Sequence, residues 1–91
     1  MEVSYDPVKN ERNIVERGLS FEQAAQFNFE TALFIEDTRR DYGETRWQAL
    51  GFLDGRLHML VFAETGASIR VISFRKANKR EVRRYEQATR S

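Results

Sequence analysis

The alternation of apolar and polar residues divides the chain into helical and extended segments. A helix is predicted to begin at Pro7, which suits the first helical position, with Asp6 before it as the N-cap. It is predicted to end at Gly18, the usual residue for a left-handed C-cap. Val8 and Val15, seven residues apart, give this helix a thin apolar stripe.

A second N-terminal helix is predicted directly after the first. Ser20 and Gln23 fit a capping box, in which each side chain satisfies a free backbone N–H group. Phe21, Ala24 and Ala25 follow with the i, i+3, i+4 spacing of a helix that packs on a core.

From residue 32 onward the period changes to that of β-strands. Asp54-Gly55 is the strongest hairpin signal, because a type I′ turn needs positive φ at both positions. Short turns also separate the other apolar segments, which favours an antiparallel meander. The four predicted strands cover residues 32–37, 45–53, 56–63 and 69–76.

Asn78 and Glu81 resemble a second capping box and open a C-terminal helix, whose inner face carries Val82, Tyr85 and Thr89. The predicted fold class is therefore α+β: two N-terminal helices, a four-stranded antiparallel β-meander and a C-terminal helix. With no linker or repeat in the pattern, we expect residues 1–91 to form a single domain.

Composition excludes several kinds of chemistry. The chain has no cysteine and one histidine, His58, so thiolate metal sites, a cysteine nucleophile and a histidine metal cluster are excluded. The five glycines are scattered and form no phosphate-binding loop. The longest apolar run, residues 59–63, is far short of the ~20 residues of a membrane span, and the opening residues lack a secretory pattern. We expect a cytoplasmic protein that needs no cofactor and no metal.

The net charge of +1 hides a strong asymmetry. From Arg70 onward the chain has eight cationic and two acidic residues, a net charge of +6, whereas the preceding residues carry −5. This distribution indicates a polyanion-binding surface beside an acidic one, or simply a solvated basic helix.

The last predicted strand also contains three cationic residues: Arg70, Arg75 and Lys76. An arginine near each end of an apolar strand is costly to bury unless it meets an anion, either an internal carboxylate or a phosphate. Because side chains alternate along a strand, Arg70 and Arg75, five residues apart, share a face only if the strand twists strongly, ends early or contains a bulge.

Glu44 and Arg46, two residues apart, are expected to point to one face, and the second and fourth predicted strands both neighbour the third. Arg46, Arg70 and Arg75 could therefore approach one region. Metal-free RNA cleavage requires a base, an acid and positive charge for the phosphate, and a cluster of Arg and Lys with one carboxylate can supply them without a cofactor. Glu44 could equally pair with an arginine to stabilise the sheet, and both roles can coexist.

Short segments in the same order resemble the BrnT toxins. They are Asp6-Pro7, Lys9, Asn13, Gly18-Leu19-Ser20-Phe21-Glu22, Ala24-Ala25, Asp37, Glu44-x-Arg46, Gly51, residues 69–77, Lys79-Arg80-Glu81 and Tyr85-Glu86. The resemblance implies a RelE-like fold and the ribonuclease toxin of a type II toxin–antitoxin pair, which cleaves RNA and arrests translation and growth. It also implies a hetero-oligomer with a BrnA-like antitoxin, whose ribbon-helix-helix domain provides the only contact with DNA.

Position by position, the resemblance and the residue types suggest an active cluster with Glu44 as base, Lys9 as acid or charge stabiliser, and Arg46, Arg70 and Arg75 as phosphate ligands. Arg70 is the preferred catalytic arginine. The candidate RNA-binding residues are Arg17, Lys76, Lys79, Arg80 and Arg83; Arg17 stands where many relatives have histidine, and it can hold phosphate but not transfer protons. The alternative is a non-catalytic RNA-binding domain, or a subunit that only binds the antitoxin and co-regulates its operon.

Overall fold

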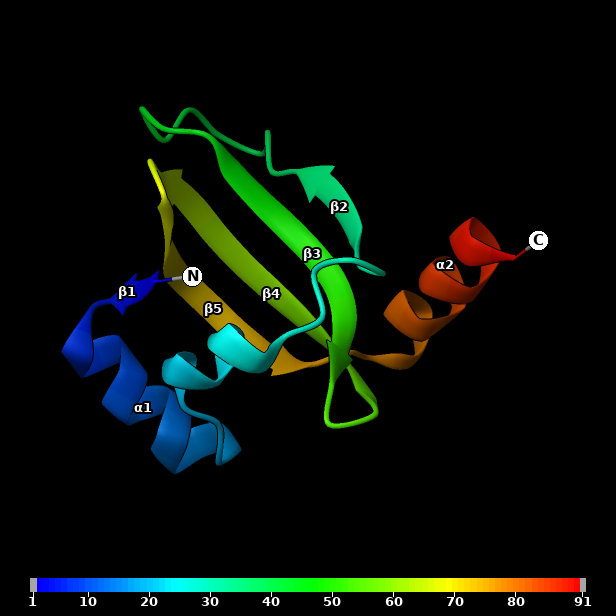
Figure 1. The fold of residues 1–91 in the computed structure, drawn as a ribbon, viewed down its shortest axis with the longest axis horizontal. Coiled ribbons are helices and arrows are strands. Elements are labelled where there is room, and N and C mark those ends of the chain that lie inside the picture. Colours follow the sequence, from blue (N-terminus) through cyan, green and yellow to red (C-terminus); the bar gives the residue numbers. More distant parts are fainter. Residues whose placement is uncertain (1, 91) are drawn as a thin grey trace.

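The computed structural model describes residues 2–90. A five-stranded sheet forms its centre, with the strand order β1-β5-β4-β3-β2. Helix α1 lies beside β1, whereas α2 lies at the far side of the sheet (Figure 1). In chain order the elements are β1 (Glu2–Tyr5), α1 (Pro7–Arg17), the 3-10 helix η1 (Phe21–Gln26), β2 (Leu33–Glu36), β3 (Arg46–Leu53), β4 (Arg56–Thr65), β5 (Ser68–Lys76) and α2 (Lys79–Thr89).

Helix α1 has the limits that its sequence predicts. The Asp6 carboxylate accepts a hydrogen bond from the backbone N–H of Val8 at 2.9 Å, and Pro7 occupies the first turn. Gly18 adopts a left-handed conformation with φ of 65°, and its N–H donates to the carbonyl of Ile14 at 2.8 Å. The capping residues therefore set both ends of the helix.

The prediction of a second N-terminal α-helix is wrong. The capping box of Ser20 and Gln23 is present, but it opens the six-residue 3-10 helix η1. Phe21 and Ala24 are both buried, and a 3-10 helix places residues i and i+3 on the same side. This short 3-10 helix thus anchors the segment, and the chain then becomes extended at Phe27, which also enters the core.

The prediction of a four-stranded sheet is also wrong, because β1 adds a fifth strand. The four predicted strands are present and pair antiparallel, whereas β1 pairs in parallel with β5, with Val3 opposite Ile69 and Tyr5 opposite Val71. Four residues give a weak local signal, and parallel pairing of distant segments leaves no turn in the sequence to reveal it. As a result β5 is an interior strand rather than an edge.

Helix α1 contacts the rest of the protein through polar side chains. Its buried residues are Asn10 and Asn13, and Asn13 donates a hydrogen bond to the carbonyl of Phe74 in β5 at 2.9 Å. The apolar stripe of Val8 and Val15 instead faces solvent, with exposed fractions of 66% and 82%. Hydrogen bonds to backbone groups, rather than apolar burial, therefore fix the orientation of this helix.

A β-bulge interrupts β5 where it pairs with β4. Val61 lies opposite Ser73, but the next residue, Phe62, lies opposite Val71, so Ile72 is an extra residue in β5. Up to the bulge, alternate residues of β5 face one side of the sheet; beyond it, the alternation is displaced by one position.

This displacement decides which way the basic residues of β5 point. Val71 and Phe74, three residues apart, are both buried in the same core cluster. Arg70 and Arg75 therefore both point away from that cluster, to the opposite face of the sheet. The sequence alone left this geometry open, and the bulge at Ile72 provides it.

The two faces of the sheet have separate cores. One face, here called the η1 face, carries Ala49, Leu60 and Phe74 and is covered by Phe21 and Phe27. The other, the α2 face, carries a second cluster consisting of Leu50, Leu57, Met59, Val61 and Tyr85, the last of which belongs to α2.

Helix α2 is short, and its contacts place it over only part of the α2 face. Tyr85 packs edge-to-face on Phe52 of β3, with 5.4 Å between ring centroids, and its hydroxyl donates to the carbonyl of Thr31 at 2.7 Å. The other half of the α2 face stays open. Within residues 2–90, no helix has the length and apolar character needed to span a membrane.

Candidate active site

Three charged side chains meet on the open half of the α2 face. The strand register places Arg46 of β3 and Arg70 of β5 on either side of Ala63 in β4. Residues directly opposite each other in adjacent strands point to the same face, so both arginines project from one side of the sheet. Glu44 lies two residues before Arg46, and the small side chain of Ala63 leaves room for the three groups above it.

One carboxylate oxygen holds both arginines. Arg46 Nε donates to Glu44 Oε2 at 3.1 Å, and Arg70 Nη2 donates to the same oxygen. These hydrogen bonds, the one from Arg70 above all, lower the pKa of Glu44 from its ordinary value. The three side chains are 25–39% exposed. The cluster thus has one more positive than negative charge, and solvent reaches it.

Tyr42 fixes the position of Arg46, although sequence reasoning did not single it out. The guanidinium carbon of Arg46 lies 3.9 Å from the centroid of the Tyr42 ring, a cation–π contact. The Tyr42 hydroxyl also donates weakly to Asp37, at 3.4 Å. The one available signal was an aromatic residue within the charged loop that precedes β3.

Asp37 holds that loop in place. Its two carboxylate oxygens accept hydrogen bonds from Arg39 Nε and Nη2, each at 2.8 Å, and the residue is buried. The hydrogen bonds from Arg39 lower the pKa of Asp37 to about 2. The loop that carries Tyr42 and Glu44 to the cluster is therefore tied to the end of β2.

Arg75 points to the same face as Arg70 but belongs to a different pair. Its Nη1 and Nη2 atoms donate to the two carboxylate oxygens of Glu81 at 2.8 and 2.9 Å. Glu81 also accepts from the backbone N–H of Asn78 at 2.9 Å, so it closes the capping box of α2. This arginine anchors α2 to the sheet and is not part of the Glu44 cluster.

Lys9, the predicted acid, lies on a different element. It is an exposed residue of α1, the helix that Asn13 attaches to Phe74. No hydrogen bond or ion pair in residues 2–90 connects Lys9 to Glu44. The structure therefore brings together Glu44, Arg46 and Arg70, but not Lys9 or Arg75.

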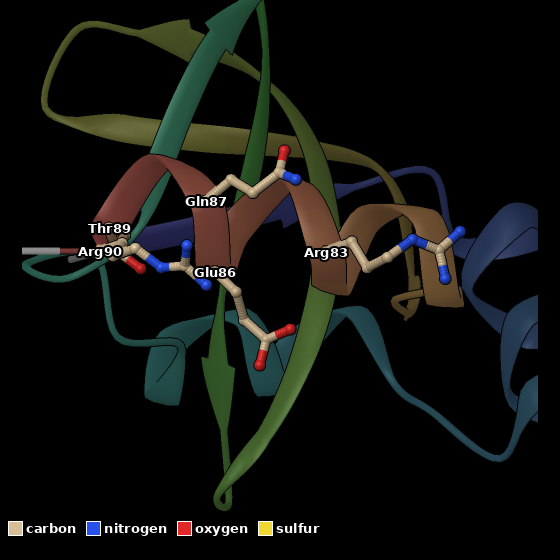
Figure 2. Close-up of a pocket in the computed structure, with 5 residues that line it drawn as sticks. All are labelled: Arg83, Glu86, Gln87, Thr89 and Arg90. Atoms are coloured by element: carbon tan, nitrogen blue, oxygen red, sulfur yellow. The ribbon is translucent and has the colours of Figure 1, made fainter.

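The predicted RNA-binding cations divide between two places. Lys79, Arg80 and Arg83 lie on the exposed side of α2, whereas Arg17 and Lys76 line a hollow at the end of α1. A shallow depression of about 610 Å³ runs along the exposed side of α2 (Figure 2). It is lined by Arg83, Glu86, Gln87, Thr89 and Arg90.

Figure 2 shows the Glu86 carboxylate lying between the side chains of Arg83 and Arg90. An acid between two cations weakens the attraction of this depression for a polyanion. The Glu44 cluster also contains an acid, but its two arginines converge on one point.

The part of the chain that the structure describes contains no cluster of three or more His, Cys, Asp and Glu side chains able to hold a metal ion. The groups that converge at the open face are instead one carboxylate and two guanidinium groups. Such a set binds and neutralises an oxyanion, above all a phosphate, because guanidinium groups match its geometry.

Comparison with protein families identifies the class of protein. A family model described as ribonuclease toxin, BrnT, of type II toxin-antitoxin system matches residues 5–81. The chain belongs to the BrnT family. No match is found among curated proteins. Membership of the BrnT family means a ribonuclease toxin whose substrate is RNA and whose partner is an antitoxin.

The matched residues include the last residue of β1, the helices α1 and η1, strands β2 to β5 and the start of α2. They therefore cover the Glu44 cluster and the Arg75–Glu81 pair. The BrnT match thus confirms the resemblance that the sequence indicated, and it names the activity for which an oxyanion-binding cluster is suited.

Proposed function

We propose that this BrnT toxin is a metal-independent endoribonuclease whose active site is the cluster of Glu44, Arg46 and Arg70. The observation that carries the proposal is a single carboxylate oxygen shared by arginines from two strands, on the open half of the sheet. Such a carboxylate occupies the position that a phosphate oxygen takes when RNA is bound.

Binding of RNA exchanges one anion for another. The scissile phosphate replaces Glu44 on the guanidinium groups of Arg46 and Arg70, each of which can donate two hydrogen bonds to phosphate oxygens. Once released, Glu44 loses the hydrogen bonds that lower its pKa, and it becomes a stronger base. The substrate itself therefore activates the catalytic group.

The released carboxylate then accepts the proton of the ribose 2′-hydroxyl. The 2′-oxygen attacks the phosphorus atom, the bond from phosphorus to the 5′-oxygen breaks, and the products are a 2′,3′-cyclic phosphate and a 5′-hydroxyl end. The leaving 5′-oxygen takes a proton from water, and the protonated Glu44 afterwards gives its proton back to solvent, so the step balances. Arg46 and Arg70 stabilise the negative charge that grows on the phosphate in the transition state.

The remaining functions follow from the BrnT family and the charge distribution. Lys79, Arg80 and Arg83 on α2 contact the RNA backbone, or an acidic part of the antitoxin. The antitoxin is a BrnA-like protein with a ribbon-helix-helix domain, through which the hetero-oligomer binds the DNA of its operon. Because its substrate is RNA, the toxin acts in the cytoplasm.

The direct test is cleavage of total RNA by the purified protein, with and without EDTA. We expect cleavage with both, and products that end in a 2′,3′-cyclic phosphate. Arg70→Ala should reduce the rate by about 100-fold or more, because it removes an oxyanion ligand. Arg12→Ala, which removes an exposed arginine of α1, is the matched control and should retain activity.

Loss of cleavage in EDTA would refute metal independence. RNA binding without cleavage would instead indicate a non-catalytic RNA-binding protein. In cells, expression of the wild-type chain should arrest growth, and co-expression of the antitoxin should restore it. Full toxicity of Arg70→Ala would place the active site elsewhere.

A further inference from the structure

The proposed reaction does not use the one histidine of the chain. His58 lies in β4, is only 5% exposed and packs against Phe74, with 5.5 Å between ring centroids. It therefore points to the η1 face, away from the Glu44 cluster. Along β4 its position is five residues from Ala63, about 16 Å along the strand. Any role of His58 is therefore spatially separate from the Glu44 cluster.

Hydrogen bonding fixes the orientation of the imidazole. His58 Nδ1 lies 2.7 Å from the backbone carbonyl of Arg56, which can only accept, so Nδ1 carries the proton and donates. In the neutral ring, Nε2 is then an acceptor. Nε2 has no hydrogen-bond partner within residues 2–90. It is not fully buried either, because the only fully buried side-chain polar atom without a partner among these residues is Trp47 Nε1. Nε2 is therefore open to the hollow that His58 lines.

That hollow has a volume of about 350 Å³, at the lower end of the range of small-molecule sites. Lys76 lies directly opposite His58 in the strand register, so the two side chains start about 5 Å apart on the same face. Arg17, at the end of α1, lines the hollow from above, together with Glu16, Gly18 and Leu19.

The charges of this hollow differ from those of the Glu44 cluster. Among the described residues, neither Arg17 nor Lys76 forms a salt bridge, whereas Arg46 and Arg70 both do. Glu16 is the one acid among the residues that line it. The hollow therefore offers two unpaired cations and a hydrogen-bond acceptor at its wall, rather than an arrangement that is already neutralised.

We propose that Arg17, His58 and Lys76 form a second site, which binds a ribonucleotide through its phosphate and an adjacent ribose hydroxyl. The two cations hold the phosphate, and His58 Nε2 accepts a hydrogen bond from the hydroxyl. The choice of a ribonucleotide rests on the proposed function, since RNA and its products are then the ligands at hand. The phosphate belongs either to a free mononucleotide or end, or to an internal phosphodiester of an RNA chain.

The test is direct binding, measured by calorimetry on the full chain. The probes are adenosine 3′-monophosphate, its 2′-deoxy analogue, inorganic phosphate and a single-stranded hexaribonucleotide. Addition of the ribonucleotide should shift the NMR signals of the His58 ring. Arg17→Gln/Lys76→Gln should weaken its binding by about tenfold or more, because two charge-assisted hydrogen bonds are lost.

The control Arg12→Gln/Arg90→Gln removes the same amount of charge from exposed positions outside the hollow, and should weaken binding less than twofold. Binding of the mononucleotide assigns the site to a free nucleotide or a chain end. Binding of the hexanucleotide alone, with the same loss in Arg17→Gln/Lys76→Gln, assigns it to an internal phosphodiester.

Three results overturn the proposal: equal affinity of the double variant and the wild type, equal affinity for the deoxy analogue or inorganic phosphate, and no binding of any probe. These results are independent of cleavage. If RNA is not cleaved but the ribonucleotide binds here, the proposed function fails and the second site remains. If RNA is cleaved but nothing binds here, the reverse holds.

Discussion

Two arginines of β5 differ in what surrounds them, although the bulge at Ile72 gives them the same face of the sheet. Arg75 makes a bidentate pair with Glu81, at 2.8 and 2.9 Å, beneath the start of α2. Arg70 shares one oxygen of Glu44 with Arg46, on the half of the face that α2 leaves open. In the first pair the charges match one to one; in the second cluster the cations are in excess.

The difference shows how one residue type acquires two roles. Glu81 is nearly buried, with a side chain 9% exposed, and it also closes the cap of α2, so exchanging it for a substrate anion would disrupt the helix. Glu44 lies in a loop before β3 and caps no helix, so a phosphate can replace it without loss of structure. Burial beneath α2 and the capping role of its carboxylate partner, rather than residue type, separate the structural Arg75 from Arg70, the proposed catalytic arginine.

The largest effect is expected from deletion of Ile72, the extra residue that gives Arg70 and Arg75 the same face. Without the extra residue, one half of β5 must turn over, so that Phe74 leaves the core and Arg75 loses Glu81. We expect a loss of roughly 4 kcal/mol or more in the free energy of unfolding, as for removal of a buried phenylalanine. Urea denaturation measures it. Ile72→Ala, which keeps the bulge, should cost only about 1 to 2 kcal/mol; equal costs would show that the bulge is dispensable.

The next effect in size concerns the covered pair. Arg75→Ala leaves Glu81 without its cation, and the free energy of unfolding should fall by about 2 kcal/mol. The RNA-cleavage rate per folded molecule should stay within about threefold of wild type, because Arg75 is not part of the Glu44 cluster. Circular dichroism and cleavage assays at a temperature where the variant is folded test both. A 100-fold loss of cleavage with unchanged stability would make Arg75 catalytic.

Stability at acid pH should reveal the contribution of the Glu81 carboxylate. Hydrogen bonds from Arg75 lower the pKa of Glu81 in the folded state. The contribution of Glu81 to the free energy of unfolding is therefore complete above its unfolded pKa, near 4.5, and is lost as the pH falls through the lower folded pKa. Asp37, with a pKa of about 2, acts in the same direction. Urea midpoints at pH 7, 4 and 3 should therefore decrease, and less steeply in Glu81→Gln. If the urea midpoint of Glu81→Gln decreases as steeply as that of wild type, Glu81 does not contribute to the loss of stability in acid.

The smallest effect on stability is expected for Glu44→Gln. Its carboxylate is exposed and caps no helix, so the urea midpoint at pH 7 should equal that of wild type within error. RNA should bind at least as tightly, because a competing anion is gone, while cleavage falls by about 100-fold through loss of the base. Weaker RNA binding in this variant would contradict the exchange of Glu44 for phosphate.

Local signals in the sequence predicted most elements and part of the site. Asp6-Pro7 and Gly18 defined α1, Asp54-Gly55 defined the turn between β3 and β4, and Asn78 with Glu81 defined the start of α2. Each is a case in which a side chain or a φ angle acts within a few residues of its own position.

The spacing of Glu44 and Arg46, with the order of the strands, also predicted the approach of Arg70, because side-chain alternation and antiparallel pairing are fixed rules of a sheet. Local sequence signals were therefore sufficient to predict the antiparallel strands, the helix caps and the membership of the BrnT family.

The remaining features depend on contacts that form only in the folded chain. The parallel pairing of β1 with β5 joins residues that are far apart in the sequence. The outward position of Val8 and Val15 likewise depends on how α1 packs against the sheet. The bulge at Ile72 is similar, since the position of an extra residue depends on how both faces of the sheet pack. These features rest on the free energy of packing distant segments together, and that energy selects which of the two arginines is covered and which stays open to solvent.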